Sequence, residues 1–312
     1  MQAHDPQSLT PPSIIFIPDL TNAITRHHPY PIDGGAYGNI YQCTYHAPEG
    51  DVKVAIKAIR PLSTNAAELT ELSQILRREL GIWKRLGHPN ILNLIGTAQK
   101  FGPLVASVAP WMVDGTLTSF LKEKRDTLKL RDRLRLLRDI AEGLDYLHRC
   151  SFTADGGNFG PVVHGDLTGS NVLINNGSAC LTDFGLSGTL QTLIGMSYLA
   201  KTSCRPGAVR WAAPELVSDA QPPAAVTIQS DIYSFGSIML QVLTGDVPWS
   251  HQPSELVITV QVSQGHIPPR PPGDCVTNRC WDFILRCWSM TPNNRPSAAE
   301  ALQFVVSEQS LA

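Results

Sequence analysis

The sequence predicts an α+β protein of two lobes, in which a small, mostly antiparallel sheet with one main helix precedes a larger helical lobe. Residues 30–110 contain β-branched and aromatic runs, such as IYQCTYH and VKVAIKAI, separated by turn residues in APEGD. After Pro110 the apolar residues recur at helical spacing. We expect a cleft between two such lobes, where small ligands tend to bind.

The composition indicates a globular protein and argues against several classes of function. The chain has 312 residues, of which 43% are hydrophobic and 17% charged, enough for one large core or two smaller ones. A formal net charge of -2 leaves no excess of Lys and Arg for a nucleic-acid backbone or an anionic membrane. The seven cysteines are an odd number and no signal-like segment precedes them, which argues against a secreted disulfide framework. We expect a cytoplasmic protein without nucleic-acid or membrane partners, and the sequence does not determine its oligomeric state.

The helices are predicted from apolar residues that recur every three or four positions. In the small lobe this spacing covers residues 66–86 and stops before Gly87. In the large lobe it predicts helices over residues 128–149, 229–243 and 280–288.

The remaining segments suggest where the folded domain begins and where it divides. Residues 1–13 are polar and proline-rich and are expected to form a flexible tail. The domain would then span residues 14–312, with the small lobe at 14–109 and the large lobe at 110–312. The glycine-rich segment SFTADGGNFGP at 151–161 is expected to be a loop, either a solvated insertion or a docking site.

A glycine-rich turn, IDGGAYGNIY, lies between a short strand and the run IYQCTYH. Gly34, Gly35 and Gly38 would let backbone N–H groups approach phosphates closely, because no side chains intervene. Taken alone, the pattern fits an ordinary hairpin turn equally well.

Five polar residues further along are the candidates for chemistry. Lys57 lies in the apolar run VAIK and needs a nearby anion, because an unpaired buried charge is costly; Glu79 on the next helix could supply a carboxylate. Asp166 and Asn171 stand five residues apart in HGDLTGSN, and Asp183 follows a strand in TDFG. An aspartate there can reach Mg2+, which takes one or two carboxylates plus substrate phosphates. Singly, each residue could instead be a snorkelling lysine, a solvated helix position or a turn cap.

The order of these motifs resembles that of a protein kinase catalytic domain, from about Tyr30 almost to the C-terminus. After the glycine turn come VAIK, a helix glutamate before HPN, HGDLTGSN, DFG, APE at 213–215, DIYSFG at 231–236 and RPS at 295–297. Within this family, the sequence is most similar to the tyrosine-kinase-like branch in the segments CWDFILRCW, RWAAPEL and SDIYSFG. Members of that branch mostly phosphorylate serine and threonine. HGDL with a later asparagine also resembles aminoglycoside and choline kinases, but those enzymes generally lack the APE, DIYSFG and RPS segments. The resemblance therefore implies a bilobal protein-kinase-like fold, ATP and Mg2+ as cofactors, and protein Ser/Thr hydroxyls as substrates.

The resemblance also implies a role for each candidate. Lys57 would hold the α- and β-phosphates of ATP while Glu79 orients it, Asp166 would accept the proton of the substrate hydroxyl, and Asn171 and Asp183 would bind Mg2+. The backbone covering the phosphates would be that of Asp33, Gly34, Gly35 and Gly38. The adenine would lie among Ile40, Val54, Ala55 and Leu173, beside the backbone of Pro110, Trp111 and Met112, with Ala109 at the rear.

Further residues would support this site. His164, Phe184, Trp83 and Asp231 would pack or anchor it. Glu215 and Arg295 would form an ion pair that braces the large lobe.

Four positions depart from the pattern of the family. Asp33 replaces a glycine, and Gly165 replaces an arginine that grips a phosphorylated activation loop in many relatives. Thr168 replaces a catalytic-loop lysine and Ala208 a threonine of the same site. Losing one preorganised charge typically slows a reaction about 10²- to 10³-fold, so slow but measurable transfer is expected.

Two expectations follow from these departures. Alanine at the activation-loop hydroxyls should leave activity largely unchanged; these residues are Thr189, Thr192, Ser197, Thr202 and Ser203. The alternative to an enzyme is a pseudokinase, a scaffold that keeps the fold with or without nucleotide binding.

Overall fold

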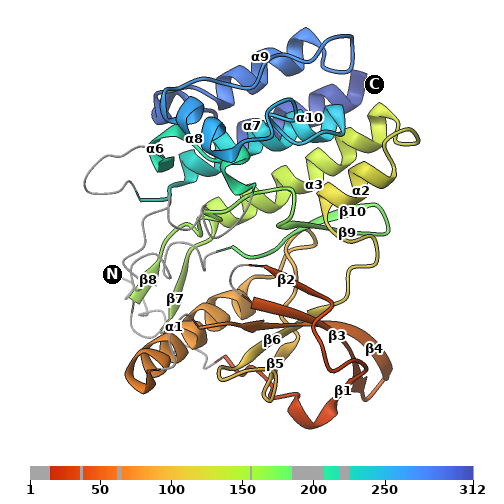
Figure 1. Cartoon of the computed structure of the whole chain (residues 1–312), viewed down its shortest axis with the longest axis vertical. Helices are drawn as coiled ribbons and strands as arrows, with labels where there is room; N and C mark the ends of the chain where they lie inside the picture. Colours follow the sequence, from red (N-terminus) through yellow and green to blue (C-terminus); the bar gives the residue numbers. More distant parts are fainter. Residues whose placement is uncertain are drawn as a thin grey trace, which may run out of the picture.

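Figure 1 shows a computed structural model with a small lobe of strands and a large lobe of helices. The structure describes residues 15–35, 38–61, 65–154, 157–184, 207–217 and 225–311. The predicted α+β, bilobal fold is confirmed. The predicted tail at residues 1–13 lies outside the described residues, and the domain boundaries stay predictions.

The sheet of the small lobe has the strand order β1-β3-β4-β6-β5, with β2 paired to β3, and every pairing in it is antiparallel. The strands are β1 (Ile24–Arg26), β2 (Asp33–Gly35), β3 (Gly38–Ala47), β4 (Gly50–Ile59), β5 (Gly96–Ala98) and β6 (Ala106–Pro110). Along β4 the side chains of Val54, Ile56 and Ala58 are buried in the sheet core. Because side chains alternate along a strand, Lys57 faces the opposite side of the sheet.

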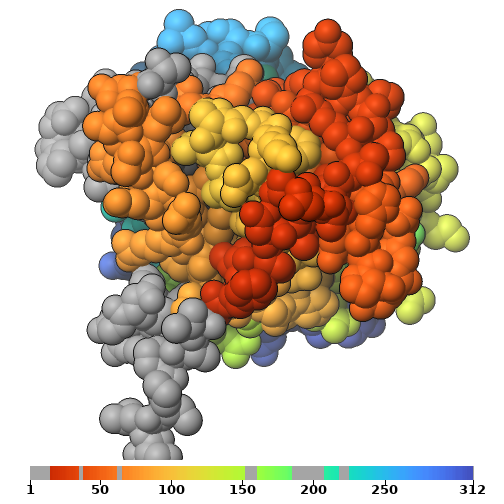
Figure 2. Space-filling view, turned by 90° about the horizontal axis from the view of Figure 1, so that it is seen from below, coloured from red at the N-terminus to blue at the C-terminus, as the bar shows by residue number. Residues whose placement is uncertain are grey.

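The first described residues run along the edge of this sheet. The N–H of Thr97 on β5 donates to the carbonyl of Pro18 (2.9 Å), and the N–H of Leu20 donates to the carbonyl of Thr97 (2.7 Å). Gly96 permits this approach, because a Cβ there would lie 2.6 Å from the Pro18 oxygen. In Figure 2, which shows the small lobe from below, red surface from the beginning of the described chain borders the yellow surface of the β5–β6 region.

Helix α1 (Ala66–Arg85) crosses one side of the small lobe and buries Leu76, Glu79 and Leu80. It was predicted over residues 66–86, and it ends one residue earlier because Leu86 adopts an extended conformation. At its start, the side chain of Asn65 accepts the N–H of Ala67 at 2.9 Å and so satisfies one of the donors left open by the first turn.

The large lobe is built around helix α7 (Ile228–Thr244), which lies between α3 (Leu130–Arg149) and α9 (Asn278–Cys287) in Figure 1. Every residue of α7 from Ser230 to Leu243 is buried. The other described elements of this lobe are α2 (Leu117–Glu123), β7 (Phe152–Ala154), β8 (Gly157–Phe159), β9 (Val172–Asn175), β10 (Ser178–Leu181), η2 (Ala208–Trp211), α6 (Pro214–Val217), α8 (Glu255–Ser263), η3 (Pro292–Asn294) and α10 (Ala298–Leu311). None of the described helices is long and apolar enough to cross a lipid bilayer.

Two predictions about this lobe need correction. The helices begin one or two residues away from the predicted positions, since polar caps such as Thr227 and Thr277 set their first turns. The segment at 151–161, predicted to be a loop, contains the antiparallel hairpin β7–β8, in which Phe152 pairs with Phe159.

Candidate active site

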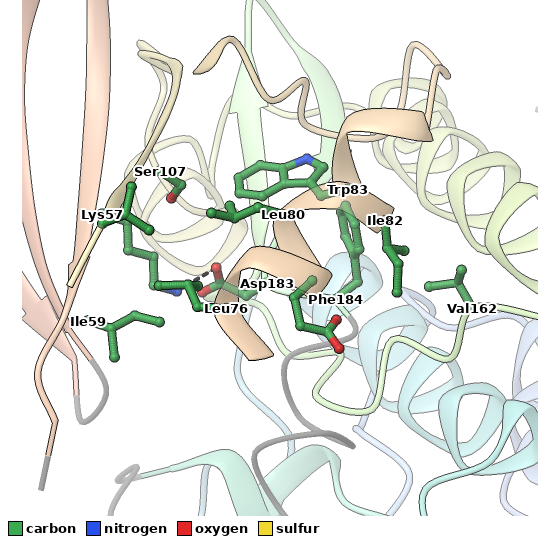
Figure 3. Close-up of a pocket in the computed structure, with 12 residues that line it drawn as sticks. Lys57, Ile59, Leu76, Leu80, Ile82, Trp83, Ser107, Val162, Asp183 and Phe184 are labelled. Carbon is green, nitrogen blue, oxygen red and sulfur yellow. Dashed lines mark ion pairs between the residues drawn. The ribbon is translucent and has the colours of Figure 1, made fainter. Parts of the chain in front are cut away.

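Lys57 of the small lobe and Asp183 of the large lobe form an ion pair. Strand β4 places Lys57 between Ile40 of β3 and Ser107 of β6. Its Nζ lies 2.5 Å from Oδ1 of Asp183, the ion pair drawn as a dashed line in Figure 3. The two side chains are only 23% and 20% exposed, so solvent screens their attraction less than at the surface. The anion predicted for Lys57 is therefore present, contributed by the aspartate of TDFG.

An apolar pocket extends behind this ion pair. Figure 3 shows it between β4, helix α1 and the segment that carries Asp183 and Phe184, with Leu76 and Leu80 among its walls. Glu79 lines the same pocket and is only 8% exposed, so it is not a solvated helix position. Its role in orienting Lys57 stays a prediction.

Phe184 joins helix α1 to the segment before Asp166. Its ring meets that of Trp83 edge-on at 5.9 Å between centroids and that of His164 at 6.3 Å. The indole N–H of Trp83 also donates to the carbonyl of Leu92 at 2.5 Å. The predicted packing role of Trp83, His164 and Phe184 is confirmed.

Asn171 connects the loop of Asp166 to the segment of Asp183. Its Nδ2 donates to Oδ2 of Asp166 at 2.9 Å and to the carbonyl of Asp166 at 2.6 Å. Its own carbonyl accepts the N–H of Thr182 at 3.0 Å, next to Asp183 in the chain. The two acidic residues thus belong to one hydrogen-bonded framework.

Asp231 of α7 fixes the backbone next to this framework. Its carboxylate accepts the backbone N–H groups of His164 and Gly165, both at 2.8 Å, and Nε2 of His148 lies 2.9 Å away. The anchoring role predicted for Asp231 is confirmed. His148 lies in the helix predicted over residues 128–149, but spacing alone does not reveal a partner on another helix.

Two residues of the site have left-handed backbone conformations. Gly165 has φ +74° and Asp183 has φ +62°. The first position suits glycine, whereas the second strains an aspartate; such strain is held by the surrounding contacts and is common at functional sites.

Glu215 and Arg295 form the predicted brace of the large lobe. Nη1 and Nη2 of Arg295 donate to the two carboxylate oxygens of Glu215 at 2.6 and 2.8 Å. The side chain of Arg295 is fully buried. The predicted ion pair is confirmed.

Comparison with known proteins agrees with this geometry. The family model of protein tyrosine and serine/threonine kinases matches residues 29–305. The chain belongs to the protein kinase family.

The chain is similar to kinases from plants and animals. It is 27% identical over 272 residues to the serine/threonine-protein kinase STY17 of Arabidopsis thaliana, a match that covers 87% of this chain and 42% of the relative. It is 28% identical to the human serine/threonine-protein kinase TNNI3K, a match that covers 87% of this chain and 30% of the relative. It is 31% identical to the human ephrin type-A receptor 1, a match that covers 85% of this chain and 25% of the relative. The chain therefore spans less than half the length of these relatives.

The residues predicted to surround the adenine come from both lobes of the kinase domain. Ala55 pairs with Ala109, which is 4% exposed, and Leu173 of β9 pairs with Thr116. The chain continues from Ala109 through Pro110, Trp111 and Met112, whose backbone was predicted to lie beside the adenine. Their contact with the adenine stays a prediction, and the structure limits which donors could take part: the N–H of Trp111 donates to the carbonyl of Lys53 at 3.1 Å, and proline has no N–H. Of these three residues, only Met112 could donate an N–H to a nucleotide.

The glycine turn also differs from the expected phosphate cover. Oδ1 of Asp33 accepts the N–H of Gly34 at 2.7 Å, so the carboxylate uses a donor that was predicted to face phosphate. Packing within the sheet explains the glycine at position 38, because a Cβ there would lie 2.6 Å from the carbonyl oxygen of Ala58. Gly35 belongs to β2, opposite Gly38.

The other departures lie in the large lobe. Thr168 and Ala208 are both buried, at 4% and 6% exposure, and neither supplies a charge. Residues 186–206, the predicted activation loop with its Thr and Ser hydroxyls, lie outside the described residues.

Proposed function

We propose that this kinase domain transfers the γ-phosphoryl group of ATP to serine or threonine hydroxyls of a protein. The observation that carries the proposal is the convergence of Lys57 with Asp183, and of Asp183 with the Asp166–Asn171 pair through Thr182. These groups have the charges that phosphoryl transfer requires, a cation for phosphate oxygens and carboxylates for a metal and a proton.

The residues present are suited to Mg2+. Magnesium takes oxygen ligands, usually one or two carboxylates together with phosphate oxygens. Asp183 offers a carboxylate, and Asn171 offers its Oδ1, since its Nδ2 makes the bonds to Asp166. When bound, the ion would neutralise charge on the phosphates of ATP.

Asp166 is the proposed base. Asn171 Nδ2 contacts its Oδ2, and its backbone N–H donates to Nδ1 of His164 at 3.4 Å. With its backbone held by His164 and its carboxylate held by Asn171, Asp166 can accept the proton of a substrate hydroxyl at a smaller loss of side-chain freedom.

The preference for serine and threonine is supported by the relatives STY17 and TNNI3K, which are named serine/threonine-protein kinases. The competing proposal is a scaffold without catalysis. It is favoured by the bond between Asp33 and the N–H of Gly34 and by the missing charge at Thr168.

Turnover separates the two proposals. We would measure transfer of labelled phosphate from Mg-ATP to casein, with Asp126→Asn, an exposed aspartate, as the matched control. Because a positioned base contributes about 10²- to 10⁴-fold, Asp166→Asn should reduce the rate by that factor while the control equals the wild type. Equal rates for all three proteins would favour the scaffold. Label in phosphotyrosine rather than phosphoserine or phosphothreonine would refute the substrate preference.

A further inference from the structure

A buried side-chain amide packs against the loop that carries Asp166. Gln241 of α7 is 1% exposed. Its Oε1 accepts the indole N–H of Trp211 at 3.1 Å, and its Nε2 donates to Oγ1 of Thr118 at 3.0 Å. The amide thus connects α7 to η2 on one side and to α2 on the other.

Gly169, which stands between Asp166 and Asn171, rests on this amide. A Cβ at Gly169 would lie 2.4 Å from Oγ1 of Thr118 and 2.5 Å from Oε1 of Gln241. The carbonyl of Gly169 accepts the N–H of Thr118 at 3.1 Å. The loop is therefore in contact with the hydrogen-bonded pair itself.

The chemistry of the partners fixes the orientation of the amide. An indole can only donate, so it selects the oxygen of Gln241, and the nitrogen is then directed to Thr118. Trp211 cannot easily shift, because its carbonyl accepts the hydroxyl of Ser234 at 2.9 Å, also on α7. Buried polar groups that satisfy one another in this way make a local structure rigid.

We propose that Gln241 is a positioning residue for phosphoryl transfer, whose amide fixes the loop from Asp166 to Asn171 against α2 and the Trp211 segment. The expected effect of Gln241 on the reaction rate rests on the proposed function. The expected effect of Gln241 on the loop does not, because the loop can be probed without turnover.

The chain offers a matched control on the same helix. Ser237 of α7 is also 1% exposed, and its Oγ accepts the indole N–H of Trp288 at 3.1 Å. Ser237→Ala therefore removes a buried bond of the same kind that does not touch the loop. Gln241→Met removes the amide while keeping most of its length, and Gln241→Glu keeps oxygens that can accept from both the indole and the hydroxyl of Thr118.

We would determine kcat and the KM for ATP for the four proteins, together with hydrogen exchange of the amides of residues 165–171. A displacement of about 1 Å far from the chemistry can cost about 10²-fold, so Gln241→Met should lower kcat by about 10- to 100-fold without changing the KM for ATP. Gln241→Glu should recover part of this loss, and Ser237→Ala should match the wild type. Exchange in the loop should be fastest in Gln241→Met, intermediate in Gln241→Glu and unchanged in Ser237→Ala.

Two results would overturn the inference: equal kcat values for Gln241→Met and Ser237→Ala, or equal exchange in their loops. A wild-type protein without turnover would refute the proposed function instead, and the exchange comparison would then decide the inference by itself. If Gln241→Met does not fold, Thr118→Val on half-buried α2 removes the same Nε2 contact and should show the same direction of change in both measurements.

Discussion

Asp231 holds Gly165 by its carboxylate: Oδ1 accepts the backbone N–H of Gly165 at 2.8 Å, at a site where Asp231 is 1% exposed. Oδ2 accepts the neighbouring N–H of His164. The central helix of the large lobe thus fixes the backbone next to Asp166 directly.

Asp231→Asn should destabilise the protein by about 1 to 3 kcal/mol, because an amide NH2 would replace one acceptor and face a backbone donor. Urea unfolding would measure this loss. Asp282→Asn, an exposed aspartate on α9, is the control. If both variants unfold at the wild-type midpoint, Asp231 does not hold the loop.

Gly165 should resist substitution because of its backbone. Its φ of +74° is costly for any residue with a Cβ, so Gly165→Ala should lower the free energy of unfolding by about 1 to 2 kcal/mol. Gly87→Ala is the control, since a Cβ there meets nothing within 4 Å and its φ is not left-handed. Equal stabilities for these two variants would show that residue 165 carries no strain.

The Glu215–Arg295 pair should contribute far more than a surface pair of the same geometry. Removing one partner of a buried pair typically costs about 3 to 5 kcal/mol, and Arg295→Met removes the fully buried guanidinium that Glu215 contacts. Arg125 and Asp246 form an equally bidentate pair at 2.7 and 2.6 Å, but their side chains are 50% and 41% exposed. Arg125→Met should cost at most about 1 kcal/mol. Similar losses in calorimetric unfolding would contradict this account.

His88 should make stability depend on pH. Burial lowers the pKa of His88 from its ordinary value of 6.5, against the opposing effect of Glu142 and Asp145. Its ring stacks on Tyr146 at 4.8 Å, and its Nδ1 accepts the N–H of Asn90 at 3.2 Å, which requires a neutral nitrogen. Since the folded-state pKa lies below the unfolded one, this contribution is complete above pH 6.5 and is lost as the pH falls below it.

The measurement is the urea midpoint at about pH 7.5 and about pH 5.5. His88→Phe keeps an aromatic ring on Tyr146 but cannot titrate, so its midpoint should fall less than that of the wild type over this interval. An identical fall in both proteins would assign the pH dependence to other groups.

The sequence predicts the parts of this fold that repeat and misses those that depend on single polar contacts. Apolar spacing located α1 and α7 to within one residue, because a buried face must recur every three or four positions. Caps such as Thr277 break no pattern and were missed. The hairpin β7–β8 was missed because its sequence is rich in glycine and lacks alternation.

The same difference holds within the site. Local motifs predicted Lys57, Asp166, Asn171 and Asp183 as site candidates, and the Glu215–Arg295 pair was predicted by resemblance. The contact between Lys57 and Asp183 depends on how two lobes meet, which no spacing encodes. The N–H of Trp111 is engaged because the end of β6 lies beside Lys53 on the neighbouring strand β4. Gln241 gave no signal, since a single glutamine in an apolar helix is not distinctive before its neighbours are known.

The central claim is that residues from both lobes form one site for a nucleotide and its metal. Isothermal titration with Mg-ATP tests it on Lys57→Met, with Lys53→Met as the control, an exposed lysine on the same strand. A bond to a charged group is worth about 1.5 to 3 kcal/mol, so Lys57→Met should bind Mg-ATP at least about tenfold more weakly than the wild type, while Lys53→Met should bind equally well. Equal affinity of all three proteins for Mg-ATP would contradict the account.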